Sequence, residues 1–135
     1  MKPLKNIALV KLPEVTYDEQ VVQRGIDEAF YLLGYDAENF GSDDWNPLKG
    51  IVSPGDHVLL KPNMVMHENS NPDGGVLCLY TQPAVVAAVL KHVVRACESK
   101  GSITIADAPM QACDWEILIK ESGYGALVDR FQREN

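Results

Sequence analysis

Residues 54–63 have the sequence PGDHVLLKPN, in which turn-forming residues lead into a short apolar run. An uninterrupted apolar run of this length is typical of a strand covered on both faces of a parallel sheet. The run ends at Lys61 and Pro62, and a proline cannot continue the hydrogen-bond ladder of a central strand. We therefore predict a strand over residues 58–60 with polar side chains at its carboxyl end.

Two other segments have the same character. Residues 7–10 read IALV, and residues 103–106 read ITIA just before Asp107 and Pro109. Each is a short, continuous apolar run, which again predicts a strand covered on both faces. Together with residues 58–60, these segments give three predicted strands.

Helical patterns separate the predicted strands. Thr16, followed three residues later by Glu19, predicts a capping box, and the amphipathic helix behind it should stop at Gly34. Thr81 is expected to cap a second helix, which is apolar nearly all round and runs to about Ser99. This second helix should therefore be largely buried.

The elements alternate in the order strand, helix, strand, helix, strand, helix. A helix from about residue 114 and a short one around residues 127–131 complete the series. This order predicts an α/β fold of three layers, α/β/α, with a mainly parallel sheet and right-handed crossovers. Three strands are few beside the usual number of about five or six. We therefore expect residues 1–135 to be a single α/β domain, part of a larger sheet and the N-terminal part of a longer protein.

The composition and charge of the chain limit the classes of partner that we expect. The chain of 135 residues has 19 acidic and 12 basic residues and a net charge of −7. A nucleic-acid surface needs clustered lysine and arginine, which this chain lacks. No apolar stretch approaches the roughly 20 residues that span a bilayer, and the first residues do not resemble a signal peptide. We expect no nucleic-acid partner, no membrane partner and a cytoplasmic location.

The cysteines agree with a reducing compartment. Cys78, Cys97 and Cys113 are odd in number and widely spaced. They form neither a disulfide framework nor a C-x-x-C redox or metal motif.

Polar residues gather where the predicted strands end. In open parallel sheets, ligands bind beyond the carboxyl ends of the strands. Lys61 and Asn63 follow one strand, Asp107 follows another, and Thr81 opens a helix that should return to the same edge. Lys61 and the helix start could hold an anion, and Asp107 could act as a base or a metal ligand. The structural alternative is an exposed lysine, a helix cap and a turn-capping aspartate.

A metal site has weaker support. His67 and Cys78 lie in the long connection between residues 64 and 80, and with Asp107 they supply ligand types that suit zinc or iron. Their spacing matches no known ligand pattern, so no metal is assigned. The glycine-rich phosphate loops, the serine-hydrolase motif and the H-E-x-x-H zinc motif are also absent from the sequence.

Three blocks of sequence resemble the domain-of-unknown-function family 362. They are PGDHVLLKPNMV at residues 54–65, TQP at 81–83 leading into an apolar helix, and, after Gly101, IADAP at 105–109. The blocks occur in the order found in that family, and the resemblance covers roughly residues 50–110. It carries no agreed catalytic residues, but it includes Lys61, Asn63, Thr81 and Asp107.

The resemblance also implies something about cofactors. Members of that family are usually much longer, and many carry a cysteine-rich, ferredoxin-like iron–sulfur segment. This chain has no such cysteine cluster. We therefore expect it to ligate no cofactor by itself, with an iron–sulfur cluster conceivable only in a longer form.

Two hypotheses of function remain. In the first, an enzyme-like protein binds a small anionic ligand or a metal at the strand ends; the sequence does not decide whether it is an enzyme. In the second, a non-catalytic module docks to a missing C-terminal domain or to a second copy as a homo-oligomer, or serves as an accessory to an iron–sulfur redox protein.

Overall fold

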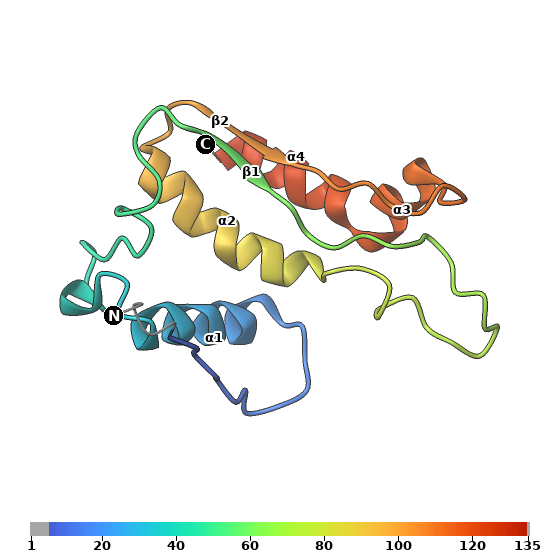
Figure 1. The fold of residues 1–135 in the computed structure, drawn as a ribbon, viewed down its shortest axis with the longest axis horizontal. Helices are drawn as coiled ribbons and strands as arrows, with labels where there is room; N and C mark the ends of the chain where they lie inside the picture. Colours follow the sequence, from blue (N-terminus) through green and yellow to red (C-terminus); the bar gives the residue numbers. More distant parts are fainter. Residues whose placement is uncertain (1–5, 135) are drawn as a thin grey trace, which may run out of the picture.

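The computed structural model describes residues 6–134. Along the chain, the elements are α1 (Glu19–Leu32), the short 3-10 helix η1 (Ala37–Asn39), β1 (His57–Leu60), α2 (Pro83–Cys97), β2 (Ser102–Ile105), α3 (Trp115–Ser122) and α4 (Tyr124–Glu134) (Figure 1). The chain is thus a mixed α/β protein, as its sequence predicts.

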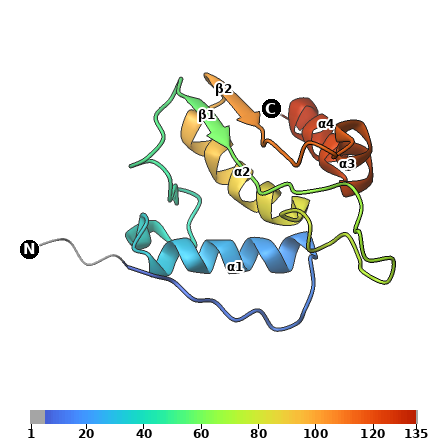
Figure 2. The ribbon, with the colours of Figure 1, turned by 45° about the vertical axis from the view of Figure 1, so that its right-hand side comes forward.

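The sheet has two parallel strands, β1 and β2, joined through α2. Their register pairs His57 with Ser102 and Leu60 with Ile105. Successive residues of each strand alternate between exposed and half-buried, with Leu60 and Ile105 on the half-buried side. Figure 2 shows the strands above α2 and α1 beyond it. One face of the sheet packs on α2, and the other is open over the described residues, so the predicted three-layer arrangement is not established.

The predicted strand over residues 7–10 does not form. The side chains of Ile7 and Leu9 are each 91% exposed, and no residue of this segment joins the sheet. A strand needs a neighbour for its backbone N–H and C=O groups, and these residues have none within the described chain. The prediction of a paired strand at this position is wrong, because an apolar run supplies the side chains of a strand but not its neighbour.

The N-cap of helix α1 lies two residues later than the predicted cap, Thr16. Asp18 is the N-cap, and its carboxylate accepts hydrogen bonds from the backbone N–H groups of Gln20 and Val21. The Thr16 hydroxyl accepts from the backbone N–H of Asp18, so it supports the cap residue. Asp18 replaces Thr16 because its carboxylate reaches the first free N–H groups of the helix.

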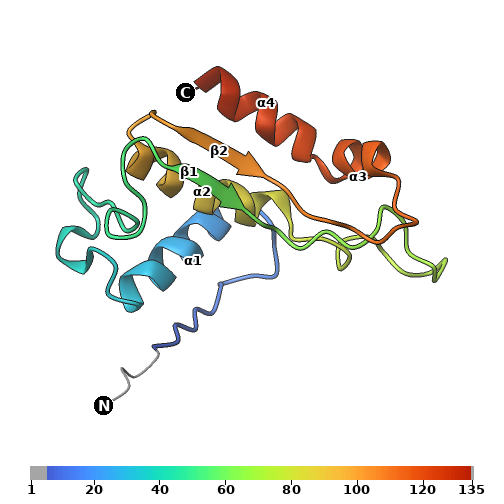
Figure 3. The same ribbon diagram turned by 45° about the horizontal axis from the view of Figure 1, so that its top comes forward.

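Helix α2 is the centre of the molecule. Its sequence is apolar nearly all round, and nine of its residues are buried. One side packs against α1, where Val22 contacts Ala84 and Ala88. Other residues of α2 pack against β1 and β2 or against α3 and α4. Figure 3 shows α2 beneath the two strands, with α4 beyond β2.

Gly101 turns the chain from α2 into β2. Its φ is +80°, and a Cβ atom there would clash with the carbonyl oxygen of Asp56. The backbone of Ser102 donates a hydrogen bond to that same oxygen, at 3.2 Å. A side chain at position 101 would therefore disturb the start of the β1–β2 ladder.

Candidate functional site

Parallel pairing brings the carboxyl ends of β1 and β2 to one edge of the sheet (Figure 3). Lys61 directly follows β1, and Asp107 follows β2 by two residues. The Lys61 Nζ atom lies 2.5 Å from Asp107 Oδ1. The sequence places both residues at this edge, and the structure brings them into an ion pair.

Asp107 is the buried member of this pair. Its side chain is 5% exposed, whereas that of Lys61 is 65% exposed. The second carboxylate oxygen, Oδ2, accepts a hydrogen bond from the backbone N–H of Met64 at 2.6 Å. The hydrogen bonds from Lys61 and then from Met64 lower the pKa of Asp107, against the opposing effect of burial.

An ionised carboxylate whose two oxygens are both engaged is a poor proton acceptor. The geometry thus favours Asp107 as a group that positions Lys61 and the strand end. It does not favour the predicted role of Asp107 as a general base.

Thr81 joins Asn63 rather than capping α2. The backbone N–H of Asn63 donates to Thr81 Oγ1 at 3.0 Å, and the backbone N–H of Thr81 donates to the Asn63 carbonyl at 2.8 Å. The N-cap of α2 is Gln82, whose side-chain amide donates to the carbonyls of Leu77 and Tyr80. The assignment of Thr81 as N-cap is wrong by one residue, because its hydroxyl is taken by a chain segment far away in sequence.

The segment that follows β1, at Met64 and Val65, is hydrogen-bonded on both of its sides. Met64 and Tyr80 form an isolated antiparallel bridge, and the backbone N–H of Val65 donates to the Leu79 carbonyl. On the other side, the backbone N–H of Met110 donates to the Val65 carbonyl. The long connection after β1 therefore returns to pair with its own beginning, which fixes the position of the site residues.

Tyr124, the first residue of α4, is a member of this region that the sequence did not reveal. It is 2% exposed, and its hydroxyl donates a hydrogen bond to the Thr81 carbonyl at 2.7 Å. Burial is the main cause that raises the pKa of Tyr124, followed by the nearby Tyr80 and Asp107. No motif or spacing marks this contact, since 43 residues separate its partners.

The exposed polar groups of the site belong to Lys61 and Asn63. These residues are two positions apart, and exposure alternates from Lys61 to Met64, with Pro62 and Met64 buried, so Lys61 and Asn63 lie on the same, exposed side. Both residues are exposed, and within residues 6–134 the Asn63 side-chain amide has no hydrogen-bond partner. By contrast, the start of α2 is covered: Gln82 and Ala84 are each 8% exposed. The helix start therefore offers an anion little access.

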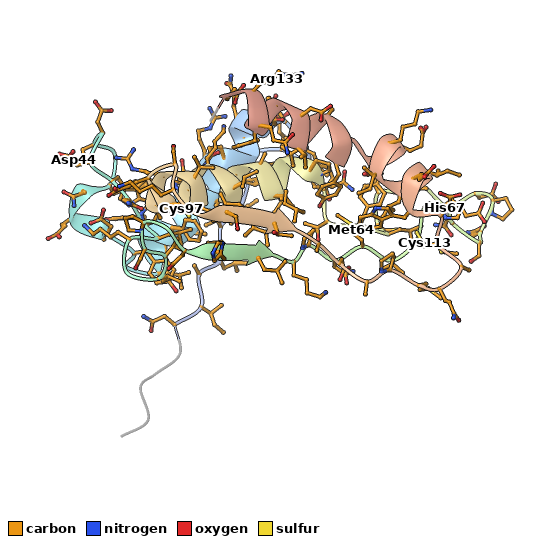
Figure 4. All side chains as sticks on the ribbon, turned by 90° about the horizontal axis from the view of Figure 1, so that it is seen from above. Asp44, Met64, His67, Cys97, Cys113 and Arg133 are labelled. Carbon is orange, nitrogen blue, oxygen red and sulfur yellow. The ribbon has the colours of Figure 1, made fainter. Side chains whose placement is uncertain are left out.

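The weak metal candidates are not gathered into a site. His67 Nδ1 accepts a hydrogen bond from the backbone N–H of Asp114, the N-cap of α3, at 2.9 Å. Cys78 is exposed, and its thiol lies 3.6 Å from the Gly75 carbonyl. Figure 4 shows His67 beside Cys113 and far from Cys97. Across the described chain, no three histidine, cysteine or acidic residues are placed to hold a metal ion, and so His67, Cys78 and Asp107 do not form one group.

Two hollows of the surface lie away from Lys61 and Asn63. One of about 240 Å³ is bounded by residues of α3 and α4 together with Met64 and Ile105. A larger groove of about 590 Å³ runs between α2, β2 and α4. Neither is lined by Lys61 or Asn63.

Comparison with known families agrees with the sequence blocks described above. The family model described as Domain of unknown function (DUF362) matches residues 58–134, which is more than half of the chain. The chain belongs to this family. The match starts in β1 and continues through α4, so it extends beyond the three blocks quoted from the sequence. Neither the curated proteins nor the solved structures gave a match.

The family description assigns no activity, and the roles of the site residues rest on their geometry. No helix within residues 6–134 is long and apolar enough to cross a membrane.

Proposed function

We propose that this DUF362 chain binds a small anion at the carboxyl ends of its strands, through the ammonium of Lys61 and the side-chain amide of Asn63. Thr81 and Asp107 are positioning residues in this proposal. The supporting observation is the exposed Lys61 ammonium, which is anchored by a buried, ionised Asp107. Two residues along the chain, Asn63 is also exposed, and its amide is unpaired within the described residues.

The chemistry of Lys61 fits this role. An ammonium group has three N–H donors, and one is directed at Asp107, which leaves the others for a ligand. Because Asp107 offsets the charge of Lys61, the attraction for an anion is moderate, and we expect weak binding. The same pairing disfavours a metal cation, which would have to displace Lys61 from the carboxylate. No reaction is proposed, since the site holds no group suited to act as a base.

Anion binding is testable by titrating the labelled protein with inorganic phosphate, and separately with acetate, at constant ionic strength. We expect saturable shifts of the backbone amide signals of Asn63 and Met64. Lys61→Ala should weaken the binding at least fivefold.

Lys100→Ala is the matched control. Its side chain is also 65% exposed and also forms an ion pair, but it precedes β2 at the opposite end of the sheet. Lys100→Ala should bind as the wild type does. Shifts that fail to saturate with either anion, or equal binding by Lys61→Ala and the wild type, would rule the proposal out.

A second candidate function is assembly with another polypeptide. The observation that favours it is exposed apolar surface on and near the sheet: Leu59 is 63% exposed on the open face, and Ile7 and Leu9 are 91% exposed. Single exposed apolar residues are ordinary, but here they lie on a strand and on a strand-like segment that lacks a partner within the described residues. The sequence predicts a third layer and further strands, which would cover such surface. We include both in the proposal of assembly.

A cytoplasmic location also stays a proposal. Its support is that Cys78, Cys97 and Cys113 are all free thiols, as expected in a reducing compartment. Fractionation of the cells that make the protein would test it, and recovery outside the cytosol would contradict it.

A further inference from the structure

A groove runs along the outer edge of β2. Its volume is about 590 Å³, and apolar residues of three elements line it: Leu90 and Val94 of α2, Ile103 and Ile105 of β2, and Val128 and Phe131 of α4. In Figure 3, α4 runs alongside β2, and α2 lies behind the two strands. The groove therefore has an apolar floor and wall next to a strand edge.

The backbone of β2 is able to pair again on this side. The N–H of Ser102 donates to the Asp56 carbonyl, and the N–H of Ala106 donates to the Leu60 carbonyl. In a parallel ladder, alternate residues bond to the same neighbour. The peptide groups of Ile103 and Ile105 are thus directed away from β1, towards the groove.

The chain also carries a segment that suits such an edge. Residues 7–10 are as long as β2, have a β-prone apolar sequence and expose Ile7 and Leu9 almost completely. Within the described residues their backbone groups have no hydrogen-bond partners. Addition of this segment to a strand edge would satisfy its backbone and bury its apolar side chains.

The handedness of crossovers decides which copy supplies the segment. β1 connects to β2 through α2, and α1 lies on the same side of the sheet as α2 (Figure 2). A right-handed connection from residues 7–10 through α1 to β1 would place the segment at the outer edge of β1, not of β2. The groove beside β2 is therefore better suited to the segment of another chain.

We propose that residues 7–10 of one copy add as a strand to the outer edge of β2 in a second copy. Reciprocal exchange makes a two-fold symmetric dimer. This inference rests on the second candidate function, assembly, and is independent of the anion site.

Sedimentation equilibrium over a wide range of protein concentration tests the proposal, together with hydrogen exchange at the Ile103 and Ile105 amides. We expect a dimer in which both amides exchange slowly. Leu9→Lys should raise the dissociation constant of the dimer about tenfold or more, because it removes the burial of one leucine per arm. It should also restore fast exchange at both amides.

Val15→Lys is the matched control. Val15 is fully exposed on the same arm but outside the strand-like segment, so this variant should dimerise as the wild type does. If the Leu9→Lys variant still forms the dimer, the proposed exchange of strands between copies is wrong, while assembly itself is supported. A monomer at every concentration would overturn both, and neither result bears on phosphate binding.

Discussion

Replacing Asp107 with alanine should destabilise the fold through the backbone of Met64. The Asp107 carboxylate accepts from the Met64 N–H at 2.6 Å and from Lys61 Nζ at 2.5 Å. Met64 is 2% exposed, so water cannot readily replace the lost acceptor. This contact links the segment after β1 to the segment after β2, and its loss should loosen the whole site.

The magnitude follows from the two contacts. A buried donor left without an acceptor costs about 1–3 kcal/mol. The ion pair adds at most about 1 kcal/mol, because Lys61 is 65% exposed and is screened by solvent. We expect Asp107→Ala to lower the free energy of unfolding by about 1–4 kcal/mol, which for a domain of this size lowers the melting temperature by about 4–16 °C.

Urea unfolding and thermal melting at neutral pH measure this loss. Asp73→Ala is a suitable control because Asp73 is an exposed aspartate in the loop after β1, and its carboxylate makes no hydrogen bond or ion pair within residues 6–134. Equal stability of Asp107→Ala and Asp73→Ala would refute the assigned role of Asp107.

The pH dependence provides a second check. The folded state lowers the pKa of Asp107, so its stabilising effect is complete above the unfolded pKa and disappears as the pH falls through the folded value. Asp107→Asn has no such titration. The stability difference between the wild type and Asp107→Asn should therefore shrink as the pH is lowered from neutral towards about 3. A difference that stays constant over this range would contradict the assignment.

Two further substitutions test how the site is supported. Gly101→Ala should cost about 2 kcal/mol or more in unfolding free energy, because a Cβ would meet the Asp56 carbonyl and the backbone is left-handed; unchanged urea unfolding would refute this. Tyr124→Phe should cost about 1 kcal/mol, because the Thr81 carbonyl loses its hydrogen bond; a melting temperature equal to that of the wild type would show that water replaces the hydroxyl.

Gly101→Ala and Tyr124→Phe each have a matched control variant elsewhere in the chain. A Cβ added at Gly50 would meet no heavy atom within 4 Å, and the φ of this glycine is not positive, so Gly50→Ala should be neutral. Tyr17 is 53% exposed, and Tyr17→Phe should leave the melting temperature unchanged.

Much of the site could be predicted because its placement follows from parallel pairing. Neighbouring strands that are joined through a helix pair in parallel, and this brings Lys61 and Asp107 to one edge of the sheet. The partner of each side chain could not be predicted in this way. Whether Thr81 caps a helix or holds Asn63 depends on where a distant loop returns.

The sequence by itself determined the strands β1 and β2, the helices between and after them, and the shared edge, because apolar periodicity and turn residues act over a few neighbouring positions. Only the tertiary structure decided that residues 7–10 stay unpaired within the described chain, that Asp107 accepts from Met64 and that Tyr124 reaches Thr81. These contacts join segments far apart in the chain. Which of them form depends on packing around α2, and no local pattern encodes that packing.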